Sequence, residues 1–112
     1  MARSGIHHPD VVDLVTQAQD GTVRLIVAET AALTGNDALP LQQKLKNYLA
    51  FAKDGRFASS YPNLQGQPVR IRVDLYAPPD DLILEFLRRF RVLALREAVE
   101  VELSIDQQDV AL

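Results

Sequence analysis

The sequence feature that most constrains the fold is a strand, helix and strand pattern between residues 69 and 105. Apolar and polar residues alternate over residues 69–76, as in a β-strand that buries one face. Apolar residues at helical spacing follow Pro78 and Pro79, which suit the threshold of a helix. A second alternating stretch runs over residues 99–105. This order predicts a parallel crossover unit in which the helix packs on the sheet.

The predicted helix of this unit begins beside Asp80 and Asp81, whose charges favour a helix N-terminus. Its buried stripe is expected to comprise Leu82, Ile83, Phe86, Leu87, Phe90, Leu93 and Ala94.

The first half of the chain predicts a hairpin followed by another helix. Residues 11–18 and 23–27 form two apolar stretches on either side of Asp20-Gly21, which favours a two-residue hairpin turn. Residues 41–52 carry apolar side chains at helical spacing, and Gly55 is expected to end that helix.

The element order β-β-α-β-α-β predicts an α+β fold, a two-layer α/β sandwich. We expect a four-stranded mixed sheet with both helices packed on one face, because the strands have one apolar and one polar face. Arg70 and Arg72 would face Glu100 and Glu102 if the last two strands are neighbours, so we predict that they are. The strand order is otherwise left open.

The length of 112 residues fits one domain, expected over residues 10–106. Residues 1–9 are interpreted as a flexible N-terminal leader and residues 107–112 as a short tail. The net charge of −3 argues against nucleic acid as a partner, and no apolar run is long enough to cross a membrane. The absence of cysteine excludes thiolate chemistry and fits a reducing compartment, so we expect a cytoplasmic protein.

Three segments carry a resemblance to a known family. They are Val12-Asp13-Leu14, the helical run from Leu41 to Phe51, and Ser60-Tyr61-Pro62 with the stretch from Gly66 to Ile71. They resemble a family of small bacterial proteins that is known only as a domain of unknown function. The resemblance covers roughly residues 10–105 and implies one domain, without catalytic residues to carry over.

The sequence predicts no catalytic residues, no metal site and no cofactor. His7 and His8 are the only histidines and lie beside Asp10 in the expected leader, too few for a zinc site. Ser59 and Ser60 have no histidine in an ordered element to act as their base. The aspartates are interpreted as solvated or helix-capping residues; they are Asp13, Asp74, Asp80 and Asp81.

Arginines on the second helix and on the strands could be read as a nucleic-acid surface. Only Tyr76 is a plausible base-stacking aromatic on the sheet, and the strand order differs from that of the common single-strand RNA-binding module. We therefore do not expect nucleic-acid binding.

An apolar strip lies beside the core stripe of the second helix and is flanked by arginines, a composition typical of a partner surface. Its residues are Leu84, Arg88, Arg91, Val92 and Leu95. The leading hypothesis is a non-catalytic domain that acts through protein–protein contacts, either as a homodimer or with an unknown protein partner.

The alternative hypothesis is a small-ligand-binding module. Its pocket would lie between loop 56–68 and the helices, lined by Phe57, Tyr61 and Tyr76. An enzyme ranks third, because the sequence reveals no convergent set of catalytic side chains.

Overall fold

The computed structural model describes residues 5–7, 12–53, 59–64 and 66–112. Its strands and helices are β1 (Leu14–Gln17), β2 (Val23–Glu29), η1 (Gly35–Asp37), α1 (Ala38–Lys53), η2 (Pro62–Leu64), β3 (Val69–Leu75), α3 (Asp81–Arg96), β4 (Glu100–Ile105) and β5 (Gln108–Val110). The predicted α+β class and the mixed sheet are confirmed.

The sheet has five strands in the order β1-β2-β3-β4-β5. The central strands β2, β3 and β4 run parallel, and β1 and β5 pair antiparallel at the two edges. Arg70 pairs with Glu100 and Arg72 with Glu102, which confirms that β3 and β4 are neighbours.

The fifth strand corrects the expected four-stranded sheet, since it falls in the predicted tail. Asp106 and Gln107 both adopt positive φ, at 50° and 67°, so the chain reverses within two residues and residues 108–110 pair with β4. Such a turn normally has asparagine, aspartate or glycine at its first position and glycine at its second. Asp106 fits the first position, but Gln107 stands where glycine is usual, so the sequence carries little local indication of the reversal.

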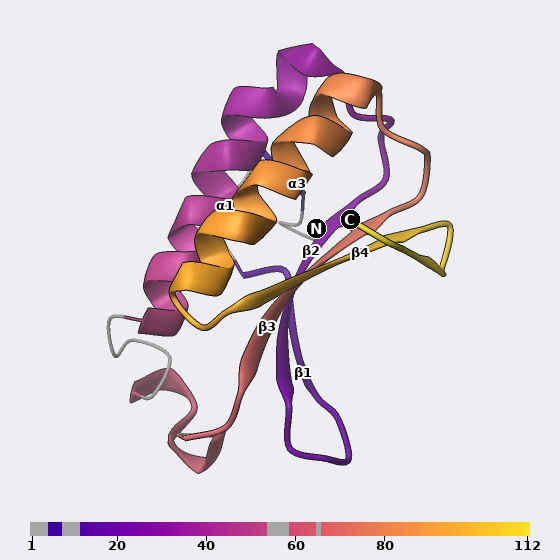
Figure 1. The fold of residues 1–112 in the computed structure, drawn as a ribbon. Coiled ribbons are helices and arrows are strands. Elements are labelled where there is room, and N and C mark those ends of the chain that lie inside the picture. Colours follow the sequence, from indigo (N-terminus) through magenta and orange to yellow (C-terminus); the bar gives the residue numbers. More distant parts are fainter. Residues whose placement is uncertain (1–4, 8–11, 54–58, 65) are drawn as a thin grey trace.

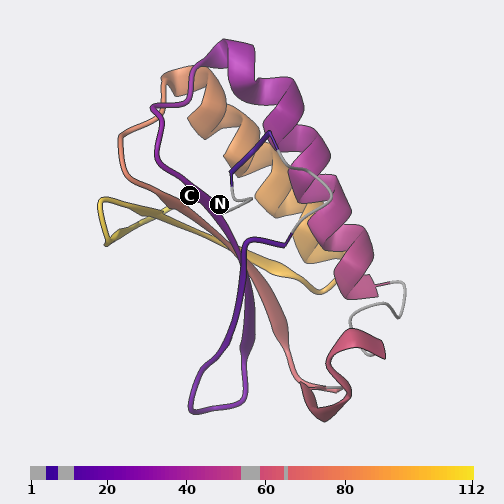
Figure 2. The ribbon, with the colours of Figure 1, turned by 180° about the vertical axis from the view of Figure 1, so that it is seen from behind.

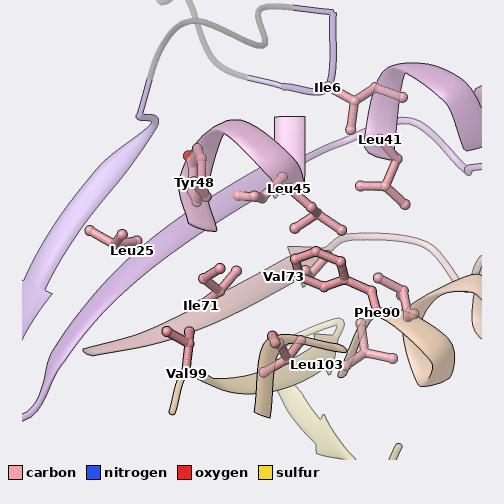
Figure 3. Packing of buried hydrophobic residues seen from close by; sticks show 14 of the residues in the cluster. Ile6, Leu25, Leu41, Leu45, Tyr48, Ile71, Val73, Phe90, Val99 and Leu103 are labelled. Carbon is pink, nitrogen blue, oxygen red and sulfur yellow. The ribbon is translucent and has the colours of Figure 1, made fainter. Parts of the chain in front are cut away.

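Both helices pack on the same face of the sheet, as Figures 1 and 2 show from opposite sides. Each helix follows a parallel strand and returns the chain to the start of the next one, so α1 and α3 begin at the same end of the molecule. Figure 3 shows the core between the layers, where side chains of α1 and α3 meet Ile71, Val73 and Leu103 of the sheet.

The β1–β2 hairpin differs from the predicted two-residue turn. Gly21 has a φ of 94°, whereas Asp20 does not adopt positive φ. The amide of Gly21 donates to the carbonyl of Ala18, and the amide of Ala18 donates to the carbonyl of Thr22. The loop therefore has three residues and places only the glycine in the left-handed region.

The ends of α3 are well capped. The Asp80 side chain accepts a hydrogen bond from the amide of Ile83, which confirms a capping role, and also one from the amide of Gly35 before α1. At the other end, the amides of Ala98 and Val99 donate back to Leu95 and Ala94 in a Schellman arrangement. Gly55, the expected end of α1, lies outside the described residues.

The buried stripe of α3 is narrower than predicted. Ile83, Leu87, Phe90 and Ala94 are buried, whereas Leu82 and Leu93 are 68% and 54% exposed. The helix rests on the sheet along one line of side chains, so residues at the margin of the predicted stripe remain in solvent.

The described part of the expected leader, residues 5–7, lies on the domain. Ile6 is fully buried in the core, as Figure 3 shows beside Leu41. The main chain there is held by carboxylates, since Gly5 donates to Asp13 and Ile6 donates to Glu29. The sequence placed this segment outside the domain because it contains only one large apolar residue.

Candidate functional site

The predicted contact strip is largely accessible on α3. Arg88, Arg91, Val92 and Leu95 are exposed, and Val92 and Leu95 are 51% and 55% exposed. Leu84 is partly buried and packs against the core. The strip therefore presents four of its five residues to solvent, and its role as an interface stays a prediction.

The helix layer carries most of the large hydrophobic residues that are exposed among those the structure describes. Eight large hydrophobic residues are exposed in the part of the chain that the structure describes. Five of them lie on the helices, namely Leu39, Leu82, Val92, Leu93 and Leu95. Four of these five belong to α3, so this helix is the principal apolar feature of the surface.

The charges on α3 are segregated along its axis. Asp81 and Glu85 lie in its first half, Arg88 lies at its midpoint, and Arg89, Arg91 and Arg96 lie in its second half. Glu85 forms ion pairs with Arg88 and Arg89 one turn further on, with nitrogen–oxygen distances of 4.0 and 3.3 Å. The outer face thus has an acidic N-terminal end and a basic C-terminal end.

The residues of the alternative pocket are not brought together. Tyr61 precedes β3 and packs, partly buried, against the core, whereas Tyr76 follows β3 and is 63% exposed. The seven-residue strand between them spans about 20 Å. Phe57 lies outside the described residues.

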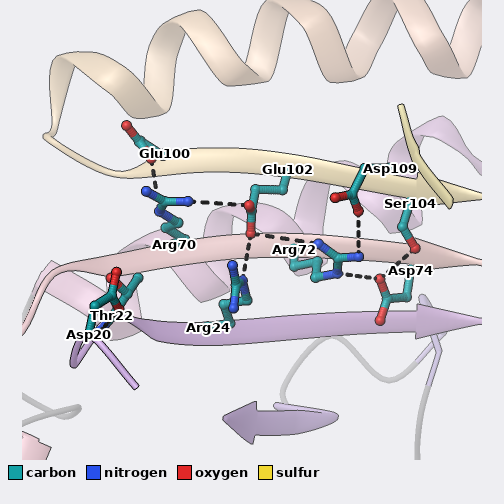
Figure 4. Close-up of polar contacts among 10 residues, drawn as sticks. All are labelled: Asp20, Thr22, Arg24, Arg70, Arg72, Asp74, Glu100, Glu102, Ser104 and Asp109. Carbon is teal, nitrogen blue, oxygen red and sulfur yellow. Dashed lines mark hydrogen bonds and ion pairs between the residues drawn. The ribbon is translucent and has the colours of Figure 1, made fainter. Parts of the chain in front are cut away.

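The face of the sheet opposite the helices carries a continuous ion network (Figure 4). Glu102 lies between three arginines, at 2.9 Å from Arg24, 3.3 Å from Arg70 and 3.9 Å from Arg72. Arg70 also pairs with Glu100 at 2.9 Å. Alternation along the strands turns these side chains away from the core, as the sequence predicted for Arg70, Arg72 and the two glutamates.

Arg72 is the most heavily engaged of these arginines. Its Nε lies 2.8 Å from Asp74, and its Nη2 lies 2.8 Å from Asp109 of β5. Burial lowers the pKa of Arg72, but the hydrogen bonds to Asp109 and Asp74 outweigh this effect and leave the pKa above its ordinary value. The contact with Asp109 depends on β5, a strand that the sequence did not predict.

A pocket of about 300 Å³ adjoins this network where the parallel strands end. Ala28, Asp74 and Ser104 stand in one row across β2, β3 and β4 and form its floor. Tyr76, Asp106 and Gln107 complete the lining from the segments that follow β3 and β4. Of the two predicted pocket residues that the structure describes, Tyr76 is part of it and Tyr61 is not.

A second polar cluster lies in the interior, between α1 and the hairpin. Lys44 Nζ lies 2.6 Å from Asp13 Oδ1, and Lys44 also donates to the carbonyl of Gly5. The Tyr48 hydroxyl donates to the carbonyl of Ile26 and accepts from the amide of Asp13. Asp13 is thus neither solvated nor a helix cap, contrary to the prediction.

The sequence contained a signal for this cluster. Lys44 follows Leu41 by three residues and precedes Tyr48 by four, so it lies on the buried stripe of α1. A lysine at that position needs an opposite charge. The partner could not be identified from sequence, because Asp13 is 31 residues away.

The described residues contain no group of three or more histidine or carboxylate side chains arranged to hold a metal ion. Among the helices that the structure describes, none combines the length and apolar character needed to cross a bilayer.

No curated protein and no solved structure matches this chain. A family model described as a family of unknown function (DUF6572) matches residues 4–107, which is nearly the whole sequence. The match includes β1 to β4 and both long helices, and thus the core and most of the surfaces described above. The chain therefore belongs to the family of unknown function DUF6572.

Proposed function

We propose that the chain is a non-catalytic domain that acts through protein–protein contacts, and that its partner is a second copy of itself bound along α3. The observation that carries this proposal is the combination, on one helix, of four exposed aliphatic residues with segregated charges. Apolar residues supply the free energy of association, and charges set the orientation.

The charge order of α3 favours pairing with a copy of itself. In a two-fold symmetric dimer, two equivalent helices can cross antiparallel, so that each end meets the opposite end of the other helix. Asp81 and Glu85 of one copy would then approach the second-half arginines of the other copy. Leu82 would likewise approach the region of Val92 and Leu95.

The same pairing is disfavoured for α1. Its exposed charged residues are Lys46 and Lys53, and it carries no acidic residue in its first turn. Two copies of α1 would bring lysine against lysine, which is repulsive at any orientation. Leu39 is its one large aliphatic residue among those exposed in the described chain.

Light scattering coupled to size-exclusion chromatography, over a hundredfold range of protein concentration, tests the proposal. We expect a mass that rises from the 12.5 kDa of one chain to twice that value. Leu95→Glu and Val92→Glu should shift the protein to the monomer and leave its circular dichroism spectrum unchanged, since both residues are more than half exposed. Leu84→Glu is less suitable, because Leu84 packs against the core.

Leu39→Glu is the matched control, because it adds the same charge to an exposed leucine of the neighbouring helix. It should leave the dimer unchanged. A wild-type protein that remains a monomer at every concentration, or a dimer that Leu95→Glu and Leu39→Glu weaken equally, would contradict pairing through α3.

A further inference from the structure

We propose that the pocket at the ends of β3 and β4 binds a small organic cation, with an amine, amidinium or guanidinium group. This site lies on the face of the sheet opposite the helices, so it goes beyond the pairing of α3 and is independent of it. The pocket volume of about 300 Å³ is at the lower end of the range for small-molecule sites and fits a compact ligand.

The position of the pocket suits a binding site. It forms where β2, β3 and β4 reach their carboxyl ends, on the face of the sheet opposite α1 and α3. Its walls come from the segments after the strands, whose side chains are not needed for the core. The sheet thus provides the floor of the pocket, and exposed residues of the connecting segments provide its walls.

The charges of the pocket favour a cation over an anion. Arg72 is the one cationic side chain of the lining, and its guanidinium nitrogens already face Asp74, Asp109 and Glu102 (Figure 4). An anion would have to compete with these three carboxylates. Arg72 therefore acts as a partner of the carboxylates and leaves little positive potential for a ligand.

Carboxylate oxygens remain available in the same lining. Asp74 uses Oδ1 to accept from both Arg72 and Ser104, and its Oδ2 has no hydrogen-bond partner among the described residues. The Asp106 carboxylate likewise has none in that part of the chain. Two carboxylates that border one pocket with spare acceptor capacity are suited to a ligand that donates hydrogen bonds and carries positive charge.

Tyr76 adds an aromatic surface to these carboxylates. Tyr76 is 63% exposed and lines the pocket, where its ring can lie against a cationic or planar group. A ligand placed over the ring would cover part of this exposed aromatic surface. An amidinium or guanidinium could stack on the Tyr76 ring and donate hydrogen bonds to the carboxylates at the same time, because it is both planar and cationic.

The β4–β5 turn brings Asp106 and Gln107 to the pocket through an unfavourable backbone. Both residues have positive φ, which aspartate tolerates and glutamine adopts only at a cost. The side chains at these two positions are thus presented at the pocket despite the strain of the turn.

Three probes of the same shape and different charge test the inference: benzamidine, benzamide and benzoate. We expect millimolar benzamidine to shift the amide NMR signals of residues 74–76 and 104–107, while benzamide and benzoate leave them unchanged. Asp106→Asn should weaken benzamidine binding by at least about fivefold, since one ligand-facing charge is lost and the turn is retained. Tyr76→Ala should weaken it by a similar factor.

Glu100→Gln is the matched control, because it removes one negative charge from the same face at the opposite end of β4. It should change the benzamidine affinity by less than about twofold. Absence of benzamidine binding, equal binding of benzoate, or equal weakening by Asp106→Asn and Glu100→Gln would overturn the inference. None of these outcomes bears on the mass measurements that test pairing through α3.

Discussion

Lys44 and Asp13 form an ion pair that is almost completely withdrawn from solvent. Lys44 Nζ lies 2.6 Å from Asp13 Oδ1, and the two side chains are 0% and 1% exposed. Asp13 Oδ2 accepts from the amides of Ala28 and Gly5, so both carboxylate oxygens are engaged. The Lys44 ammonium also lies 5.9 Å from the centre of the Tyr48 ring. The cluster joins α1, β2 and the N-terminal segment at one point of the interior.

Lys44→Met is predicted to lower the free energy of unfolding by about 3–5 kcal/mol, because it leaves the Asp13 carboxylate buried without its counter-charge. Urea denaturation monitored by circular dichroism measures this. Lys46→Met, two positions away on the exposed side of α1, should change stability by less than about 0.5 kcal/mol. The double variant Lys44→Met with Asp13→Asn should lose less than the sum of its parts. Additive losses would show that the two side chains are not energetically coupled.

Tyr48 is predicted to make the fold sensitive to alkaline pH. Burial raises the pKa of the Tyr48 hydroxyl above its ordinary value of 10.0, and the nearby charge of Asp13 adds to this effect. Above pH 10 the unfolded chain therefore loses the proton while the folded chain keeps it, so stability falls as pH rises. Below pH 10 the hydroxyl is protonated in both states and contributes no pH dependence.

Tyr48→Phe should lower stability at pH 7 by about 1–3 kcal/mol, since the amide of Asp13 and the carbonyl of Ile26 lose a buried partner. The variant should also show a smaller loss of stability between pH 10 and pH 11 than the wild type. Thermal unfolding between pH 10 and pH 11 measures this loss for both proteins. If the melting temperature of Tyr48→Phe falls with pH as steeply as that of the wild type, Tyr48 is not the cause of the alkaline sensitivity.

Ala98→Gly is predicted to stabilise the protein. Ala98 adopts a φ of 61° at the end of α3, in the Schellman position that glycine normally occupies. Removing the Cβ relieves the strain of the left-handed region, and the added freedom of the unfolded chain offsets part of the gain. We expect a net gain of about 0.5–1 kcal/mol in thermal or urea unfolding. A loss of stability would mean that the Ala98 methyl makes a contact worth more than the strain.

Glu102→Gln is predicted to lower the free energy of unfolding by about 1 kcal/mol at low ionic strength and by less in high salt. The reason is that Glu102 lies beside three arginines in a partly exposed network. Glu100→Gln should cost less than about 0.5 kcal/mol, since Glu100 is 57% exposed and pairs with Arg70. Urea unfolding at two salt concentrations compares the variants. An equal loss of unfolding free energy in Glu102→Gln and Glu100→Gln would mean that the three arginines around Glu102 add nothing beyond one ion pair.

Elements with strong local patterns could be predicted from the sequence. The alternation over residues 69–76 and 99–105 indicated β3 and β4, and the opposite charges at 70, 72, 100 and 102 indicated that these strands are neighbours. Asp80 was predictable as a helix cap because capping is decided within one turn. The exposure of Leu82 and Leu93 was not, since the width of a buried stripe depends on what packs against it.

By itself, the sequence determined the order of the elements from β1 to β4 as β-β-α-β-α-β, the apolar faces of the sheet and helices, and the polar face of the sheet. Each of these depends on periodicity over a few residues. The tertiary structure decided three other features. It buried Ile6 and the pair of Lys44 and Asp13, it added β5, and it placed Tyr76 beside Asp74 and Asp106. The buried pair and the pocket join residues that are far apart in the chain. The strand β5 requires positive φ at two residues of the turn before it, which the sequence there does not strongly favour. The free energies of these features come from contacts that exist only once the sheet and helices have assembled.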